Sequence, residues 1–207
     1  MKKIILGLLL PLAPAASFAQ TLKDFFSNTA ITATWLGCDF TQAKVIGDPA
    51  PASSFVFEVF SGINDLMIKE FKKYDIKGAF RRAALDNDLT VVTKRNGDIN
   101  KDRVISTNAA DETRLKVGDI KALVKSMGYN KPDIGILFIV EGMDRNSQIE
   151  TVWVTIVDMK TSSVLLTERI QGQTKSGMST KNYWANGIEK VIEEIKKHKY
   201  DEWKKSN

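Results

Sequence analysis

The sequence predicts an α/β (α+β) fold: a single-domain sandwich with a mixed sheet of about four to five strands and packed helices. Three observations lead to this prediction. The apolar run at 134–140 has the length of a strand that is covered on both faces. Strand-forming residues and turns alternate over 151–170, which is typical of an antiparallel hairpin. Amphipathic helical patterns precede the run and follow the hairpin.

The helix before the apolar run is expected to begin at Asp119, whose carboxylate can cap it. Gly128 stands where a left-handed residue commonly ends a helix, and Pro132 prevents continuation. The buried face of this helix is predicted to consist of Ile120, Leu123, Val124 and Met127.

The run Ile134–Val140 has no polar alternation, so we expect a strand with both faces buried. A run this short could also form the core of a helix, but its length and the flanking proline and glycine favour a strand. Turns are expected at 143–148 and 158–163, with antiparallel strands at 151–157 and 164–170.

A long closing helix is expected after the hairpin, with Ser179 or Thr180 as its cap. Its apolar stripe has the width needed to lie on a sheet. The stripe consists of Trp184, Ile188, Val191, Ile192 and Ile195.

Residues 1–19 are predicted to be a secretory signal peptide, with two lysines, a short apolar core and a small-x-small site that ends at Ala19. The apolar core is too short to span a bilayer as a stable helix. The alternative is a buried N-terminal helix. No cysteine lies near the cleavage point, so a lipoprotein anchor is not predicted. We therefore expect a periplasmic or secreted protein with a mature domain at 20–207 and no transmembrane segment.

In the first half, a strand is expected over 31–40, followed by a stiff connector at 48–51. Ser53 or Ser54 is expected to cap a helix with an unusually wide apolar stripe, interpreted as core and not as a ligand cradle. That stripe runs through Phe55, Val56, Phe57, Val59, Phe60, Ile63, Leu66, Met67, Ile68, Phe71 and Tyr74.

Between this helix and the second half of the chain the patterns are weaker. A helical turn or two is expected over 76–84, with Arg81 and Arg82 pointing outward. The residues at 89–93 have the composition of a strand. The polar segment 94–116 is the least ordered-looking part of the mature chain.

Composition is that of a soluble globular protein, with 43% hydrophobic and 27% charged residues. The net charge of +5 falls to +3 once Lys2 and Lys3 are removed with the signal peptide, which does not indicate a nucleic-acid partner. Cys38 is the only cysteine, so no internal disulfide can form. Its place within an apolar strand pattern predicts a buried thiol.

Gly172–Ser179 has the glycine and serine spacing of a phosphate-binding loop, between a strand and a helix. Met178, however, stands where the loop needs its lysine, and the preceding strand is expected to be antiparallel. We therefore interpret the segment as a glycine-punctuated connection.

Asp98–Asp102 places oxygen side chains at alternate positions as calcium loops do, but it lacks the turn glycine and the bidentate glutamate. A solvated turn is the better interpretation.

No catalytic, cofactor-binding or metal-binding residue is predicted. His198 is the only histidine and lies among lysines near the end of the closing helix, where cations suit the helix dipole. Glu193 and Lys197 are expected to form a helix-supporting pair. The basic segment 196–205 is expected to be a solvated end, although it could touch acidic partners or a membrane surface.

The order helix, glycine, buried strand, glycine, hairpin, helix resembles a group of exported bacterial envelope accessory domains. The group includes the activator lipoproteins of penicillin-binding proteins, the curli-secretion lipoprotein family and the N-terminal domain of TolB. The matching residues lie in the C-terminal half: Gly128, Gly142, Asp158 and Thr161. Ser162 replaces the turn glycine, and the lipidation cysteine is missing. The resemblance implies an α/β sandwich that interacts with proteins in the envelope, and it carries over no catalytic residue.

The sequence therefore favours an exported, non-enzymatic envelope protein that acts through protein–protein interaction, with another envelope protein as its partner. The alternative is a periplasmic small-molecule or glycan-binding protein that uses exposed aromatic residues such as Trp153 or Trp203. A hydrolase comes third, because active sites assembled from scattered residues leave no local motif.

Overall fold

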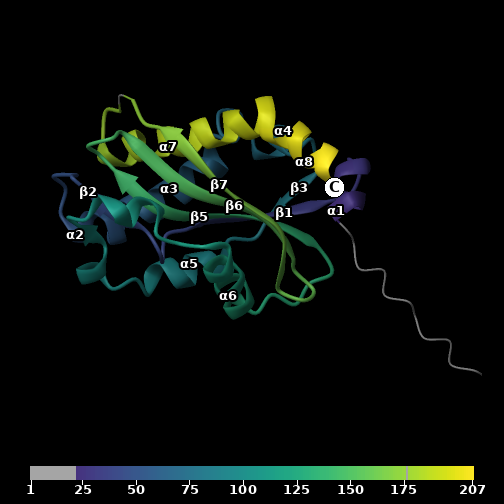
Figure 1. Cartoon of the computed structure of the whole chain (residues 1–207), viewed down its shortest axis with the longest axis horizontal. Coiled ribbons are helices and arrows are strands. Elements are labelled where there is room, and N and C mark those ends of the chain that lie inside the picture. Colours follow the sequence, from purple (N-terminus) through teal and green to yellow (C-terminus); the bar gives the residue numbers. More distant parts are fainter. Residues whose placement is uncertain (1–21, 176) are drawn as a thin grey trace, which may run out of the picture.

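The computed structural model describes residues 22–175 and 177–207 and confirms the α/β class. Seven strands form one mixed sheet, which is more than the four or five expected. Helices cover both of its faces (Figure 1). The predicted signal peptide, 1–19, lies outside the described residues.

The long strand β5 is the centre of the sheet. On one side it pairs in parallel with β1 and, further along, with β2, while on the other side it pairs antiparallel with β6. The short strands β3 and β4 extend the sheet beyond β1 and β2, and β7 pairs antiparallel with β6. The strands are β1 (Ala33–Asp39), β2 (Lys44–Ile46), β3 (Leu85–Asn87), β4 (Ile105–Ser106), β5 (Ile134–Asp144), β6 (Ile149–Asp158) and β7 (Ser163–Gln173).

The apolar run in β5 is continuous because both of its faces are covered. Ile136 and Phe138 belong to one hydrophobic core, and Leu137 and Ile139 belong to a second core on the opposite face. This confirms the predicted strand. It extends four residues beyond Val140, so the turn after it occupies only 145–148.

The larger core lies beneath the helices α1 (Leu22–Ser27), α2 (Ala52–Ser54), η1 (a π-helical turn, Phe55–Val59), α3 (Phe60–Lys69), α4 (Ile76–Ala79), α7 (Thr180–Glu194), η4 (a π-helical turn, Ile195–Lys199) and α8 (Tyr200–Ser206). The smaller core lies beneath α5 (Thr90–Gly97) and α6 (Val117–Met127). Two short 3-10 turns, η2 (Lys101–Arg103) and η3 (Ala109–Thr113), lie between them in the chain. Figure 1 shows α7 and α8 along one face of the sheet and α5 and α6 along the other.

The ends of the predicted helices are partly as expected. Gly128 adopts the left-handed conformation, with φ 65°, directly after α6, and Ser179 caps α7 by accepting the N–H of Asn182 at 3.2 Å. Asp119 is not the cap of α6. It lies in the first turn, where its carboxylate accepts the backbone N–H of Lys116 at 2.8 Å. Pro51, and neither serine, precedes α2, and no side chain caps that helix.

The predicted strand at 89–93 is wrong, because Leu89 precedes α5 and residues 90–93 belong to it. Asp88 accepts the N–H of Thr90 at 3.2 Å and supports the first turn, while Val92 packs into the smaller core. The strand in this part of the chain is β3, which ends just before α5. Neither β3 nor β2 was predicted from the sequence. The polar segment 94–116 is structured and is tied to the sheet by Arg114, which donates to the carbonyl of Glu141 at 3.2 Å.

Two buried asparagines complete the edge of β1. β3 pairs only with Ala33–Trp35, which leaves the later part of β1 without a neighbouring strand on that side. Asn64 of α3 accepts the N–H of Cys38 at 2.7 Å and donates to its carbonyl at 2.9 Å. Asn96 of α5 donates to the same carbonyl at 2.9 Å and accepts the N–H of Phe40 at 2.8 Å. Side-chain amides thus replace a strand and attach one helix of each layer to β1.

Asn64→Ala is expected to lower the free energy of unfolding by about 1–3 kcal/mol, because the buried N–H of Cys38 loses its acceptor. Urea denaturation monitored by circular dichroism measures this change. Asp65→Ala is the control, since Asp65 is exposed and its pair with Lys69 contributes only about 0.3–0.5 kcal/mol. Equal stability losses in the two variants would contradict the role given to Asn64.

Candidate functional site

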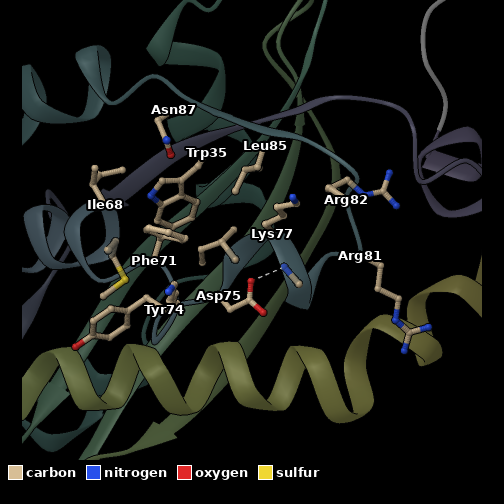
Figure 2. A pocket seen from close by; sticks show the side chains of 14 residues that line it. Trp35, Ile68, Phe71, Tyr74, Asp75, Lys77, Arg81, Arg82, Leu85 and Asn87 are labelled. Atoms are coloured by element: carbon tan, nitrogen blue, oxygen red, sulfur yellow. Dashed lines mark hydrogen bonds between the residues drawn. The ribbon is translucent and has the colours of Figure 1, made fainter.

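A cavity of about 540 Å³ opens at the sheet edge, where β1 and β3 meet the end of α3 and the turn that carries α4. We call it the Trp35 cavity, after the residue that lies among its lining side chains (Figure 2). Its volume is within the range of about 300–1,000 Å³ that is usual for small-molecule sites.

The Trp35 indole combines an apolar ring with an unused hydrogen-bond donor. The ring packs edge-on against Phe138, with 5.0 Å between centroids, and only 1% of the residue is exposed. Its Nε1–H is buried without an acceptor among the described residues. A buried unpaired donor costs about 1–3 kcal/mol, so each such group calls for an explanation.

The other three tryptophans of the chain all use their indole N–H groups. Trp153 donates to Glu141 at 2.8 Å, Trp184 donates to Asp48 at 3.1 Å, and Trp203 donates to Glu168. Trp153 and Trp203 are 5% and 4% exposed. The expectation that these two are exposed binding aromatics is therefore wrong, because both are anchored in the core by carboxylates.

The apolar wall of the cavity consists of residues that were predicted to be core. Ile68 is 38% exposed and Phe71 is 63% exposed. The prediction extrapolated one helical stripe along the whole segment, but α3 ends at Lys69 and Phe71 lies in the following turn. Phe57 is 72% exposed because it lies in the π-helical turn η1, whose wider turn changes the phase of the side chains.

Asp75 shapes the side of the cavity formed by α4. It caps this short helix by accepting the N–H of Gly78 at 2.8 Å (Figure 2). It also accepts from Lys196 at 3.0 Å. Burial alone would raise the pKa of Asp75, but these hydrogen bonds outweigh it and hold the pKa below its usual value. A Cβ on Gly78 would lie 2.0 Å from the Asp75 carboxylate, so any larger residue there would require the Asp75 side chain to move.

The two arginines beside the cavity are used by the fold. Arg81 makes a bidentate pair with Asp201, at 2.7 and 2.8 Å, and lies over the ring of Tyr200. Arg82, predicted to point outward, is only 4% exposed. It donates to the carbonyls of Phe80 and Asn28 and to the Tyr200 hydroxyl, and burial lowers its pKa. The arginines therefore hold the C-terminal helix against the sheet edge.

The remaining residues considered from the sequence lie elsewhere. Cys38 is fully buried, as predicted, whereas His198 is exposed on η4. Gly172 belongs to β7 and packs against the carbonyl of Gly187, and Met178 is fully exposed. The predicted pair of Glu193 with Lys197 is present at 2.9 Å.

The turn at 98–102 forms the start of a 3-10 helix, with Asn100 accepting the N–H of Asp102. Within the described residues, no cluster of three or more histidine, cysteine, aspartate or glutamate side chains could hold a metal ion. The Trp35 cavity is lined by apolar side chains, by several cationic side chains and by one carboxylate that is already hydrogen-bonded. Such a lining is suited to binding a small ligand.

Two fully buried glutamates lie in contrasting surroundings. Glu141 accepts from Trp153, from Arg169 at 2.9 Å and from the backbone of Leu115. Glu150 lies against Gly187, and neither carboxylate oxygen makes a hydrogen bond of normal geometry within the described part of the chain. Burial raises the pKa of Glu150 well above its usual value, and the nearby amide of Ile188 offsets only part of this.

Comparison with known proteins gives little further information. No protein-family model matches the chain, and no curated protein matches it. One similar solved structure is described as a neuraminyllactose-binding hemagglutinin homologue from Helicobacter pylori. The two share 11% sequence identity with a TM-score of 0.29, over 86% of this chain and 89% of that chain. A TM-score this low does not establish a shared fold, so we draw no inference from it.

No helix among residues 22–175 and 177–207 is both long enough and apolar enough to cross a membrane.

Glu150→Gln is expected to stabilise the protein at pH 7–8 and to have little effect near pH 4. The folded-state pKa is raised, so the wild type loses stability as the pH rises above about 4.3, where an unfolded glutamate gives up its proton. The uncharged glutamine does not carry this penalty. Denaturant unfolding across this pH range measures the difference.

Glu141→Gln provides the matched control, since it makes the same change in another fully buried glutamate. It should destabilise the protein at neutral pH, by up to about 3–5 kcal/mol, because Arg169 loses its charged partner. If Glu150→Gln also lowered stability at pH 7–8, the assignment of Glu150 as a destabilising buried carboxyl would be wrong.

Proposed function

We propose that this chain is an exported, non-enzymatic binding protein whose ligand lies in the Trp35 cavity. The observation that carries the proposal is the buried, unpaired Nε1–H of Trp35 beside a cavity of about 540 Å³. Such cavities, mostly apolar with a few polar groups, are typical of sites for small organic ligands. Export is proposed from the signal-peptide pattern of residues 1–19, which implies a periplasmic or secreted location.

The apolar wall supports the same proposal. Ile68 and Phe71 leave much of their surface in contact with water beside the cavity, at a cost of about 25 cal/mol for each Å² of apolar area. A ligand that covers them recovers this free energy. Exposed apolar groups next to a preformed hollow therefore favour a ligand with an apolar body.

A second candidate function is interaction with another envelope protein. Phe57 supports it, since this side chain is 72% exposed and does not line the Trp35 cavity. Large exposed apolar residues that lie outside a cavity suit a flat protein interface better than a small ligand. Phe57 and Phe71 therefore separate the two candidates experimentally.

Phe71→Asp is expected to weaken binding of the neutral apolar dye phenylnaphthylamine by about tenfold or more, because a charge replaces apolar contact surface in the wall. Dye fluorescence measured in titrations of the purified protein reports the affinity. Phe57→Asp is the matched control, and its affinity should stay within about twofold of the wild type.

The same pair of variants can be compared in a crosslinking pull-down from an envelope extract. A partner captured by the wild type and by Phe71→Asp, but lost with Phe57→Asp, would favour the protein-interaction function. Failure of the dye to bind folded wild-type protein, or equal loss of dye binding in both variants, would exclude the cavity as the site.

Occupation of the cavity is also expected to move the Trp35 indole N–H resonance and to leave the other three indole resonances in place. Trp35 lines the cavity, whereas Trp153, Trp184 and Trp203 are hydrogen-bonded to carboxylates. Nitrogen–proton correlation spectra recorded with and without the dye test this, with Trp35→Phe used for assignment. An unchanged Trp35 resonance at saturating dye would place the ligand elsewhere.

A further inference from the structure

We infer that the ligand of the Trp35 cavity is an organic anion: an apolar or aromatic body that carries one negatively charged group, which pairs with Lys72 and Lys77. This inference rests on the proposed function and adds the chemical class of the ligand. It is drawn from the charges that surround the cavity and from the partners each of them already has.

The lining contains four cationic side chains and one carboxylate, so its charge is strongly positive. The carboxylate, Asp75, is engaged by the Gly78 N–H and by Lys196 from η4. It is therefore not free to receive a cationic ligand. Within the described residues, no other acidic side chain lines the cavity.

Two of the four cations are held by contacts within the fold, and the other two make no ion pair with a described residue, although Lys77 attracts Asp75 at longer range. Arg81 and Arg82 are engaged by Asp201, Tyr200 and backbone carbonyls, and both extend away from Trp35 in Figure 2. Lys72 and Lys77 are exposed. Their ammonium groups form no ion pair with any described residue. These two lysines can bind an anion without breaking an ion pair.

The lysines lie where an anion attached to an apolar body would place its charge. Lys72 directly follows Phe71 of the apolar wall, and Lys77 lies on α4, across the turn that Asp75 caps. Attraction between charges strengthens when a ligand displaces water from an apolar surface. An amphiphile whose body covers Ile68 and Phe71 therefore binds best when its charged end is negative.

Two dyes that share one aromatic body test this inference. Anilinonaphthalene sulfonate carries a sulfonate, while its parent phenylnaphthylamine is neutral. At low salt, the sulfonate should bind the wild type about tenfold more tightly than the neutral dye. Added salt should weaken only the sulfonate, because it screens the exposed lysines.

The double variant Lys72→Gln with Lys77→Gln should weaken sulfonate binding by about fivefold to tenfold and change binding of the neutral dye by less than about twofold. Lys94→Gln with Lys121→Gln is the matched control. These two lysines are also exposed and without ion pairs, they lie on α5 and α6, and the change in net charge is identical. The control pair should leave both affinities unchanged.

The outcomes separate this inference from the function beneath it. Equal affinity for the two dyes, with both weakened by Phe71→Asp, would overturn the anionic class while keeping the cavity as a binding site. An equal effect of the two lysine pairs on sulfonate binding would also overturn it, since only net charge would then matter. If neither dye responded to Phe71→Asp, the proposed function itself would fail.

Discussion

The two hydrogen bonds between the Asn64 side chain and the backbone of Cys38 fix the helix that forms one wall of the Trp35 cavity. They are possible because β3 is only three residues long and leaves this part of β1 without a strand neighbour on the side opposite β5. Gly37, with φ 97°, lies at the bulge in β1, and a Cβ there would lie 3.0 Å from the Asn64 oxygen. Ile68 is one helical turn beyond Asn64, so the register of α3 on β1 sets the position of the apolar wall. The cavity itself lies beside the paired part of this edge, where Trp35 of β1 and Leu85 and Asn87 of β3 line it.

The charged side chains around the Trp35 cavity fall into two groups: those that hold the fold together and those that make no ion pair with a described residue. Arg81 and Arg82 hold α8 and the turn after α4 together through Asp201 and Tyr200. Asp75 joins α4 to η4 through Lys196. The region around α4 and the C-terminal helices are thus joined by contacts in which the charges of Asp75, Arg81 and Arg82 are already paired or hydrogen-bonded. What remains near the cavity is apolar surface and two lysines, which explains why its preference for a ligand can be argued from so few groups.

The sequence predicted the C-terminal half of the fold well for a physical reason. β5 is buried on both faces and α7 has a regular stripe, and such patterns depend little on distant residues. β2 and β3 are too short to have a pattern of their own, and Val91 and Val92 favour a strand locally although tertiary packing makes them helical. The candidate site was missed because its wall was assigned to the core. Helical spacing was extended past the end of α3 to Phe71, and no spacing rule indicates that one indole N–H lacks an acceptor.

The complete burial of Cys38 determines when its thiol can react. In an oxidising compartment, a lone thiol endangers an unfolded chain, because two copies can join through an intermolecular disulfide. Burial raises the pKa of the Cys38 thiol well above its usual value and removes it from reagents, so the native state suppresses the reactive thiolate. Both backbone polar groups of Cys38 are held by asparagines, so the thiol becomes reactive only when this edge of β1 separates from its helices. The lone cysteine thereby acts as a built-in reporter, since its rate of alkylation follows the opening of the same strand that supports the binding cavity.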